Sequence, residues 1–193
     1  MLRLRQQIAV ESARLMSEEG IDNYKFARKK AAQTLHIHNE LAYPDHDEIL
    51  AELKIHQSLY QSTTHEHLLH NLRTTALRAM KLFQDYNPKL TGSVLLGHAV
   101  EHSGIDIQVM ADSPEEIAMH LIKHQIPYQL QEWKLYFSKH KPKATPCYQF
   151  YAGEHQINLI VLSENQRKIV PLNPLTGQTM QRATLKQLES LLA

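Results

Sequence analysis

Paired cysteines, long apolar runs and an excess of charge of one sign are all missing from this sequence. Its single cysteine, Cys147, cannot form an intrachain disulfide, so we expect a reducing compartment. The longest apolar stretches, such as 159–162, are far shorter than the roughly 20 residues of a membrane span. Polar residues interrupt the basic start of the chain, so no signal peptide is predicted. A cytoplasmic protein without a membrane partner is expected.

Charge is nearly balanced, with 21 basic against 20 acidic residues. Neither half of the chain has the strong basic bias that is typical of nucleic-acid-binding domains. The basic cluster at 25–30 could contact phosphates of RNA or of a nucleotide, but such a cluster is more often the solvated face of an amphipathic helix. What the chain does have is a hydrophobic content of 42%, which is enough for a packed core.

The first half of the chain has the apolar periodicity of helices in series. We predict helices over 3–19, 22–35, 45–59 and 65–86, with Asp22 capping the second and Asp45–Glu48 forming a capping box for the third. Asn87-Pro88 ends this pattern. The sequence therefore predicts an N-terminal helical region over 1–87 and an α/β domain over 88–193.

The second half has mostly the patterns of strands. Strands are predicted over 90–96, 105–110, 128–137, 147–152 and 156–162, with a turn at 138–146 and a loop at 171–182. Ser113 is predicted to cap a helix that begins at Pro114, has Glu116 as the reciprocal cap, and buries Ile117, Leu121 and Ile122. Thr184 with Gln187 predicts a capped last helix. The expected fold is α+β, with the N-terminal helices packed on a small mixed β-sheet.

Residues 92–110 contain the functional clue. Gly92-Ser93 follows a predicted strand, and Asp106 lies on the next one. This frame resembles the signature of the nucleotidyltransferase superfamily, in which a Gly-Ser pair is followed after roughly ten residues by Asp-x-Asp. Carboxylates two residues apart share one face of a strand, where they can hold the Mg²⁺ that nucleotidyl transfer requires. Small residues at the preceding turn let backbone amides approach phosphates.

The match to this signature is incomplete. One alignment places Gly104 at the first carboxylate and Asp106 at the second, and a looser one places Asp106 first and Gln108 second. The position of a third carboxylate, on a later strand, holds Asn158. An amide oxygen carries no charge to hold a dication, so one carboxylate remains in either alignment. Acidic residues nearby in the sequence that could substitute are Glu101, Asp112 and Glu154.

Nearly the whole chain also resembles a bacterial family described as nucleotidyltransferase-like. The shared features are Ala-Arg-Lys-Lys-Ala-Ala at 27–32, Glu-His-Ser at 101–103, Ser-Pro-Glu-Glu at 113–116, and the Pro- and Gly-bearing loop at 171–177. The resemblance implies catalytic roles for Asp106 and His102, with Asp106 as the Mg²⁺ ligand. It also implies nucleotide contacts from Gly92 and Ser93. Glu101, His102 and Ser103 could line the same site, but the interpretation of these three residues as a polar loop is favoured. The resemblance implies no particular substrate.

We therefore expect a divergent superfamily member that binds a nucleotide or a nucleic-acid end and has weak or absent transferase activity. Any activity would be metal-dependent. The alternative is a protein-interaction module that docks a partner through the helical half and keeps the old site as scaffold. The motif His65-x-His67-x-x-His70 is interpreted as a solvated helix start, because no carboxylate or cysteine completes a metal site.

Overall fold

A computed structural model describes residues 2–19, 21, 23–60, 62–138, 141–163, 166, 169–173 and 177–193, with only the backbone at 2, 57–60, 62 and 63. The fold is α+β, as expected. The chain divides into two compact units, Met1–Leu68 with His98–Ser103, and Leu69–Gly97 with Gly104–Ala193. The helices that the structure describes include none that is both long and apolar enough to cross a membrane.

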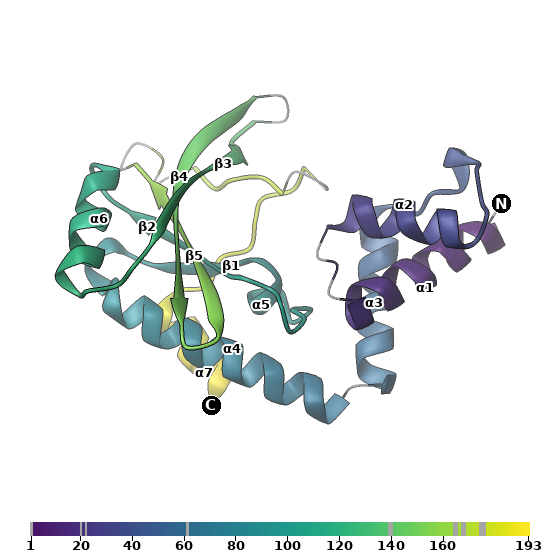
Figure 1. Ribbon diagram of the computed structural model, residues 1–193, viewed down its shortest axis with the longest axis horizontal. Coiled ribbons are helices and arrows are strands. Elements are labelled where there is room, and N and C mark those ends of the chain that lie inside the picture. Colours follow the sequence, from purple (N-terminus) through teal and green to yellow (C-terminus); the bar gives the residue numbers. More distant parts are fainter. Residues whose placement is uncertain are drawn as a thin grey trace. The chain divides into compact units, whose positions relative to one another are not determined.

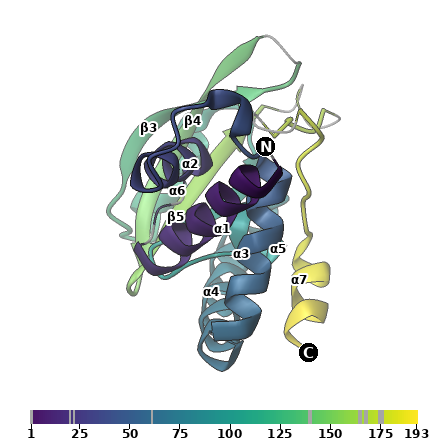
Figure 2. The same ribbon diagram turned by 90° about the vertical axis from the view of Figure 1, so that its right-hand side faces the viewer.

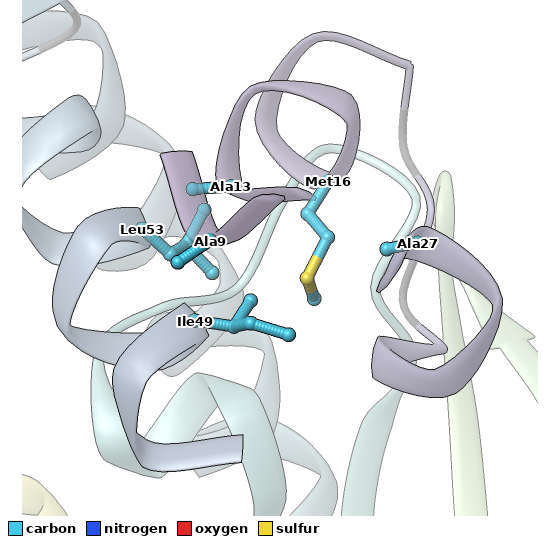
Figure 3. Packing of buried hydrophobic residues seen from close by; sticks show 6 residues of the cluster. All are labelled: Ala9, Ala13, Met16, Ala27, Ile49 and Leu53. Atoms are coloured by element: carbon cyan, nitrogen blue, oxygen red, sulfur yellow. The ribbon is translucent and has the colours of Figure 1, made fainter. Parts of the chain in front are cut away.

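The first unit is helical. It contains α1 (Leu2–Glu19), α2 (Tyr24–Thr34), the 3-10 turn η1 (Glu40–Ala42), α3 (His46–Tyr60) and the start of α4 (Ser62–Leu82). Helix α1 packs against both α2 and α3, which Figure 2 shows from the side of the N-terminus. Met16 and Ile49 point toward each other at the centre of this packing (Figure 3), and small residues such as Ala9 and Ala13 let the helices approach closely.

Local capping fixes where two of these helices begin. The predicted capping box of α3 is confirmed: the Glu48 amide donates to Asp45 Oδ1 at 2.9 Å, and the Asp45 amide donates to Glu48 Oε2 at 2.7 Å. The prediction for α2 was wrong by one residue. Its cap is Asn23, whose side-chain oxygen accepts from the Phe26 amide at 3.0 Å. Asp22 lies outside the described residues.

The second unit is built on a five-stranded sheet with the order β1-β2-β5-β4-β3 (Figure 1). The strands are β1 (Lys89–Thr91), β2 (Ile105–Met110), β3 (Gln129–Tyr136), β4 (Pro142–Ala152) and β5 (His155–Leu162). Strands β2 and β5 run parallel, and the other neighbouring pairs are antiparallel, so the sheet is mixed. The helical elements are most of α4, η2 (Gln84–Tyr86), α5 (Gly92–Leu96), α6 (Pro114–Lys123) and α7 (Leu185–Leu192).

The two faces of the sheet have different cover. On one face, the ring of Phe83 lies 6.1 Å from that of Phe150, and the hydroxyl of Tyr148 donates to the Pro114 carbonyl at 2.8 Å. The C-terminal end of α4, which Phe83 directly follows, and the N-terminal end of α6 therefore lie on this face. The other face carries Asp106 at one end and a buried apolar cluster further along, made by Met110, Leu135, Cys147, Ile160 and Leu162.

The C-terminal segment ties the two edges of the sheet together. Leu172 pairs with Tyr136 at the end of β3, and Ala183 pairs with Leu90 on β1. The hydroxyl of Thr91 also donates to the Gln181 carbonyl at 3.0 Å. Part of the loop expected at 171–182 lies outside the described residues. Helix α7 follows (yellow in Figure 2). Its predicted Thr184–Gln187 capping box is confirmed.

Several sequence-based expectations were wrong in this unit. The strand predicted over 90–96 is the short strand β1 followed by α5, because Gly92 adopts a positive φ of 75° that turns the chain. Strand β4 begins at Pro142, within the predicted turn at 138–146, two residues of which lie outside the described ones. Ser113 is the N-cap of α6 without a side-chain cap bond, and Ile122 is exposed.

The units also differ from the expected ranges 1–87 and 88–193. The second unit takes in Leu69 onward, and Phe83, which directly follows α4, packs against Phe150 of the sheet. Conversely, His98–Ser103 joins the first unit.

Candidate functional site

A row of polar side chains crosses four strands of the sheet. Thr91 on β1 lies opposite Asp106 on β2, Asp106 lies opposite Asn158 on β5, and Asn158 lies opposite Gln149 on β4. Directly opposed residues point to the same face of a sheet. The register of the sheet therefore gathers one carboxylate, one hydroxyl and two primary amides into a single row.

Hydrogen bonds orient the amide of Asn158, which is only 6% exposed. Its Nδ2 donates to Asp106 Oδ1 at 2.8 Å. Its Oδ1 accepts from Gln149 Nε2 at 3.0 Å and from Gln156 Nε2 at 2.9 Å. A carbonyl oxygen has two lone pairs, so both are in use. The amide therefore presents its positive NH₂ end to the carboxylate.

Two glycines make room for these polar groups. A Cβ added at Gly92 would lie 2.6 Å from Asp106 Oδ2, and Gly92 also has a positive φ that favours glycine. A Cβ added at Gly104 would lie 2.4 Å from Asn158 Nδ2. Any side chain at Gly104, a carboxylate included, therefore conflicts with Asn158 in its present place.

The predicted residue Ser93 lies on α5, directly after Gly92. Arg73 holds the other end of this short helix, since its guanidinium donates to the carbonyls of Val94 at 3.2 Å and Leu95 at 3.3 Å. These bonds satisfy carbonyls that a helix end leaves without partners. Arg73 therefore supports the position of Gly92 and Ser93 beside β2.

Gln108 is the neighbour of Asp106 on the same face of β2. It is fully buried, and neither its Nε2 nor its Oε1 has a hydrogen-bond partner among the residues that the structure describes. Leaving a buried polar group unsatisfied costs about 1–3 kcal/mol. Cys147 lies near this face too: burial first, and then the charge of Asp106, raise the pKa of its thiol to about 12. Such a thiol is inert at neutral pH.

Sequence reasoning missed Arg182. The antiparallel bridge between Leu90 and Ala183 places Arg182 opposite Thr91, and so on the same face as Asp106. Burial lowers its pKa, and its Nη1 is buried without a partner in the described part of the chain. No local pattern marks it, because Arg182 reaches this edge only through a pairing across about 90 residues.

The remaining predicted residues, Glu101, His102 and Ser103, belong to the first unit. Glu101 and His102 are exposed. Ser103 closes a tight turn: its Oγ accepts from the Val100 amide at 2.9 Å, and its amide donates to the Val100 carbonyl at 2.9 Å. Ser103 thus has a structural role in this turn. Gly92, Ser93 and Asp106 lie together in the second unit, whereas Glu101, His102 and Ser103 lie in the first.

A cavity of about 450 Å³ opens in the first unit, lined by Ser17, Thr64, His65, Leu68, Val100 and Glu101. His65 is only 9% exposed, and its Nε2 donates to the Ala99 carbonyl at 3.0 Å. The interpretation of this histidine as solvated was therefore wrong, whereas His67 and His70 are exposed. His65 fixes the 98–103 segment to the start of α4.

Three rings, that of buried His98 and those of half-buried Tyr24 and His46, form a second polar cluster in the first unit. The ring of Tyr24 lies 4.0 Å from that of His46 and 6.4 Å from that of His98. Burial lowers the pKa of His98 to about 4, helped by the charges of Lys54, His46 and His65. Burial likewise lowers the pKa of His46 and raises that of Tyr24. The two histidines are therefore neutral at pH 7.

The donor set at Asp106 does not fit the Mg²⁺ that the resemblance implies. Mg²⁺ is held by charged oxygen ligands in a near-ideal octahedron. Here Asp106 is the one carboxylate in the row, and the amide beside it presents NH₂. Within the described ranges, no group of three or more His, Cys, Asp or Glu residues is arranged to hold a metal ion.

Comparison with known proteins adds no family to this description. No protein-family model, curated protein or solved structure matches the chain.

Proposed function

We propose that this chain is a divergent, nucleotidyltransferase-like protein that binds a nucleotide or a nucleic-acid end on its second unit, with weak or absent transfer activity. The observation that carries the proposal is the row of Thr91, Asp106 and Asn158 beside the turn at Gly92. The row supports the proposal because it brings Asp106 next to Gly92 and Asn158, the positions that the resemblance singles out.

The parts of the row suit different parts of a nucleotide. The half-buried carboxylate of Asp106 accepts hydrogen bonds from N–H or O–H groups. Arg182, at the far end of the row, is a fixed positive charge of the kind that binds phosphate. Gly92 and Ser93 line the turn beside Asp106.

Thermal unfolding against a panel of nucleoside triphosphates tests the proposal. A ligand that binds only the folded state stabilises it by about 2.7 kcal/mol at a concentration of 100 times its Kd. We expect at least one nucleotide to raise the unfolding midpoint of the wild type, and the rise to shrink in Asp106→Asn. The matched control is Asp85→Asn, which removes the same charge from an exposed position of the same unit. It should keep the full rise.

A separate assay of nucleotidyl transfer tests for enzyme activity. We expect no robust nucleotidyl transfer by the wild type with Mg²⁺ or Mn²⁺, because two of the three carboxylate positions of the signature hold other residues. Robust transfer that is lost in Asp106→Ala would refute this part and would make Asp106 catalytic.

The interaction-module alternative would require a contiguous exposed apolar patch on the helical half. The exposed large apolar side chains described there are Leu4, Val10, Phe26, Leu41 and Ile55, of which Ile55 is the one on α3 or α4. RNA binding, for which the near-neutral charge gives little support, would be recognised by an affinity that falls steeply with salt. We place the protein in the cytoplasm, where its one thiol, Cys147, would stay reduced.

A further inference from the structure

We infer that the Asp106 site binds its ligand without a divalent cation, through a neutral group that offers two hydrogen-bond donors. The exclusion of a cation rests on the contacts of Asp106 and Asn158 alone. The nature of the ligand group rests also on the proposed function, because it takes the ligand to be a nucleotide.

The orientation of the Asn158 amide carries the first half of the inference. Gln149 and Gln156 both donate to its oxygen, and its nitrogen faces the carboxylate of Asp106. A cation drawn to Asp106 would meet the positive end of the Asn158 dipole. If Asn158 alone turned its oxygen toward the cation, its NH₂ would point at two other NH₂ groups, and three hydrogen bonds would be lost.

Gly104 locks this arrangement from the other side. Asn158 Nδ2 occupies the space that a Cβ at Gly104 would need, at 2.4 Å. No second carboxylate can therefore approach Asp106 from that position while Asn158 stays in place. The amide is held by hydrogen bonds on one side and by the absence of a side chain on the other.

The same contacts define what the site accepts. A carboxylate has two oxygens that accept hydrogen bonds, and charged acceptors form the stronger bonds. A phosphate offers only acceptor oxygens at neutral pH, so it has no hydrogen to donate to the carboxylate of Asp106. Two sources within a nucleotide offer paired donors: the 2′,3′-diol of ribose, and the imino and amino edge of guanine. Both are neutral.

Gln108 supports a polar ligand on this face. It follows Asp106 on the same side of β2, it is fully buried, and both ends of its amide are without partners in the described ranges. Strand β2 thus keeps a second group with both a donor and an acceptor next to Asp106.

The test compares three full-length proteins: the wild type, Asn158→Asp, and the charge-swapped variant Asp106→Asn with Asn158→Asp. The single variant places two carboxylates side by side. The swapped variant has one carboxylate and one amide, as in the wild type, and it keeps their hydrogen bond in reverse. Thermal unfolding is followed in chelator, in Mg²⁺ and in Mn²⁺, without nucleotide.

We expect the cations to leave the midpoints of the wild type and of the swapped variant unchanged, and Mn²⁺ to raise that of Asn158→Asp by several degrees. A wild-type midpoint that rises with Mg²⁺ or Mn²⁺, and that loses the rise in Asp106→Asn, would overturn the inference. It would mean that the three amides turn over together to present oxygen to the metal. Circular dichroism shows whether Asn158→Asp folds. If it does not, the response of the wild-type unfolding midpoint to Mg²⁺ and Mn²⁺ still tests the exclusion of a cation.

Nucleosides in chelator then identify the donor pair. Binding of guanosine and adenosine alike, with loss for the 2′-deoxy forms, assigns the ribose diol. Binding of guanosine and 2′-deoxyguanosine but not adenosine assigns the base edge. Nucleotide binding that disappears in chelator would overturn the inference but leave the proposed function intact. No binding of any nucleoside or nucleotide would refute the proposed function and the ligand half of the inference together.

Discussion

Replacing Gly104 with alanine isolates the contribution of the Asn158 network to stability. Gly104 has no positive φ, so alanine is acceptable to the backbone, but its Cβ would lie 2.4 Å from Asn158 Nδ2. Asn158 is short, 6% exposed and tied by hydrogen bonds to Asp106, Gln149 and Gln156, so it cannot move without breaking them. Overpacking of this kind costs about 1–3 kcal/mol. Alanine returns about 0.4–1 kcal/mol by restricting the unfolded chain.

The net loss is therefore about 1–2 kcal/mol, or a fall of about 2–8 °C in the unfolding midpoint for a chain of this length. The assay is urea and thermal unfolding followed by circular dichroism. Gly153→Ala is the control, because Gly153 has a φ of 65° but has no atom within 4 Å of an added Cβ. Its cost is backbone strain alone, so it should leave nucleotide binding unchanged, whereas Gly104→Ala should weaken it. If Gly104→Ala is as stable as the wild type and binds nucleotide with the same affinity, the steric conflict between position 104 and Asn158 is refuted.

Three further predictions concern stability and charge. The pKa of His98 is about 4 in the folded state, below its ordinary value of 6.5, so the unfolded chain binds more protons between these values. The free energy of unfolding of the first unit should therefore fall by up to about 3 kcal/mol from pH 6.5 to pH 4, and His98→Phe should flatten this profile in urea titrations. Leu53→Ala, in the core of Figure 3, should cost about 2–5 kcal/mol, and a loss under 1 kcal/mol would contradict the packing. Arg182→Gln should weaken calorimetric binding of a nucleoside triphosphate several-fold but not of the nucleoside, and equal effects on both would remove Arg182 from the phosphate site.

Periodicity and capping were sufficient to predict most of the secondary structure. Strands 105–110 and 156–162 were predictable because they are buried, short and apolar, and the box at Asp45–Glu48 follows from side-chain chemistry three residues apart. The error at 90–96 has a backbone cause. Val94, Leu95 and Leu96 have the apolar character of a buried strand, but the positive φ of Gly92 ends β1 and begins α5.

The candidate site was only partly predictable, because its contacts join residues far apart in the chain. Asp106 and Asn158 were each singled out from the motif, but their hydrogen bond spans 52 positions and depends on the parallel pairing of β2 with β5. The roles of Gln149 and Gln156 follow from that register and from no local pattern. Gly104 looked like a missing carboxylate, and the structure shows that Asn158 fills the space it leaves.

A nucleotide site centred on Asp106 can be tested by calorimetric titration of ribonucleoside triphosphates into the wild type and Asp106→Ala, both in chelator. We expect saturable binding of at least one nucleotide by the wild type, and an affinity about tenfold or more weaker in Asp106→Ala, which corresponds to about 1.4 kcal/mol. Absence of binding by the wild type, or the same affinity in both proteins, would contradict the claim that Asp106 is the centre of a nucleotide site.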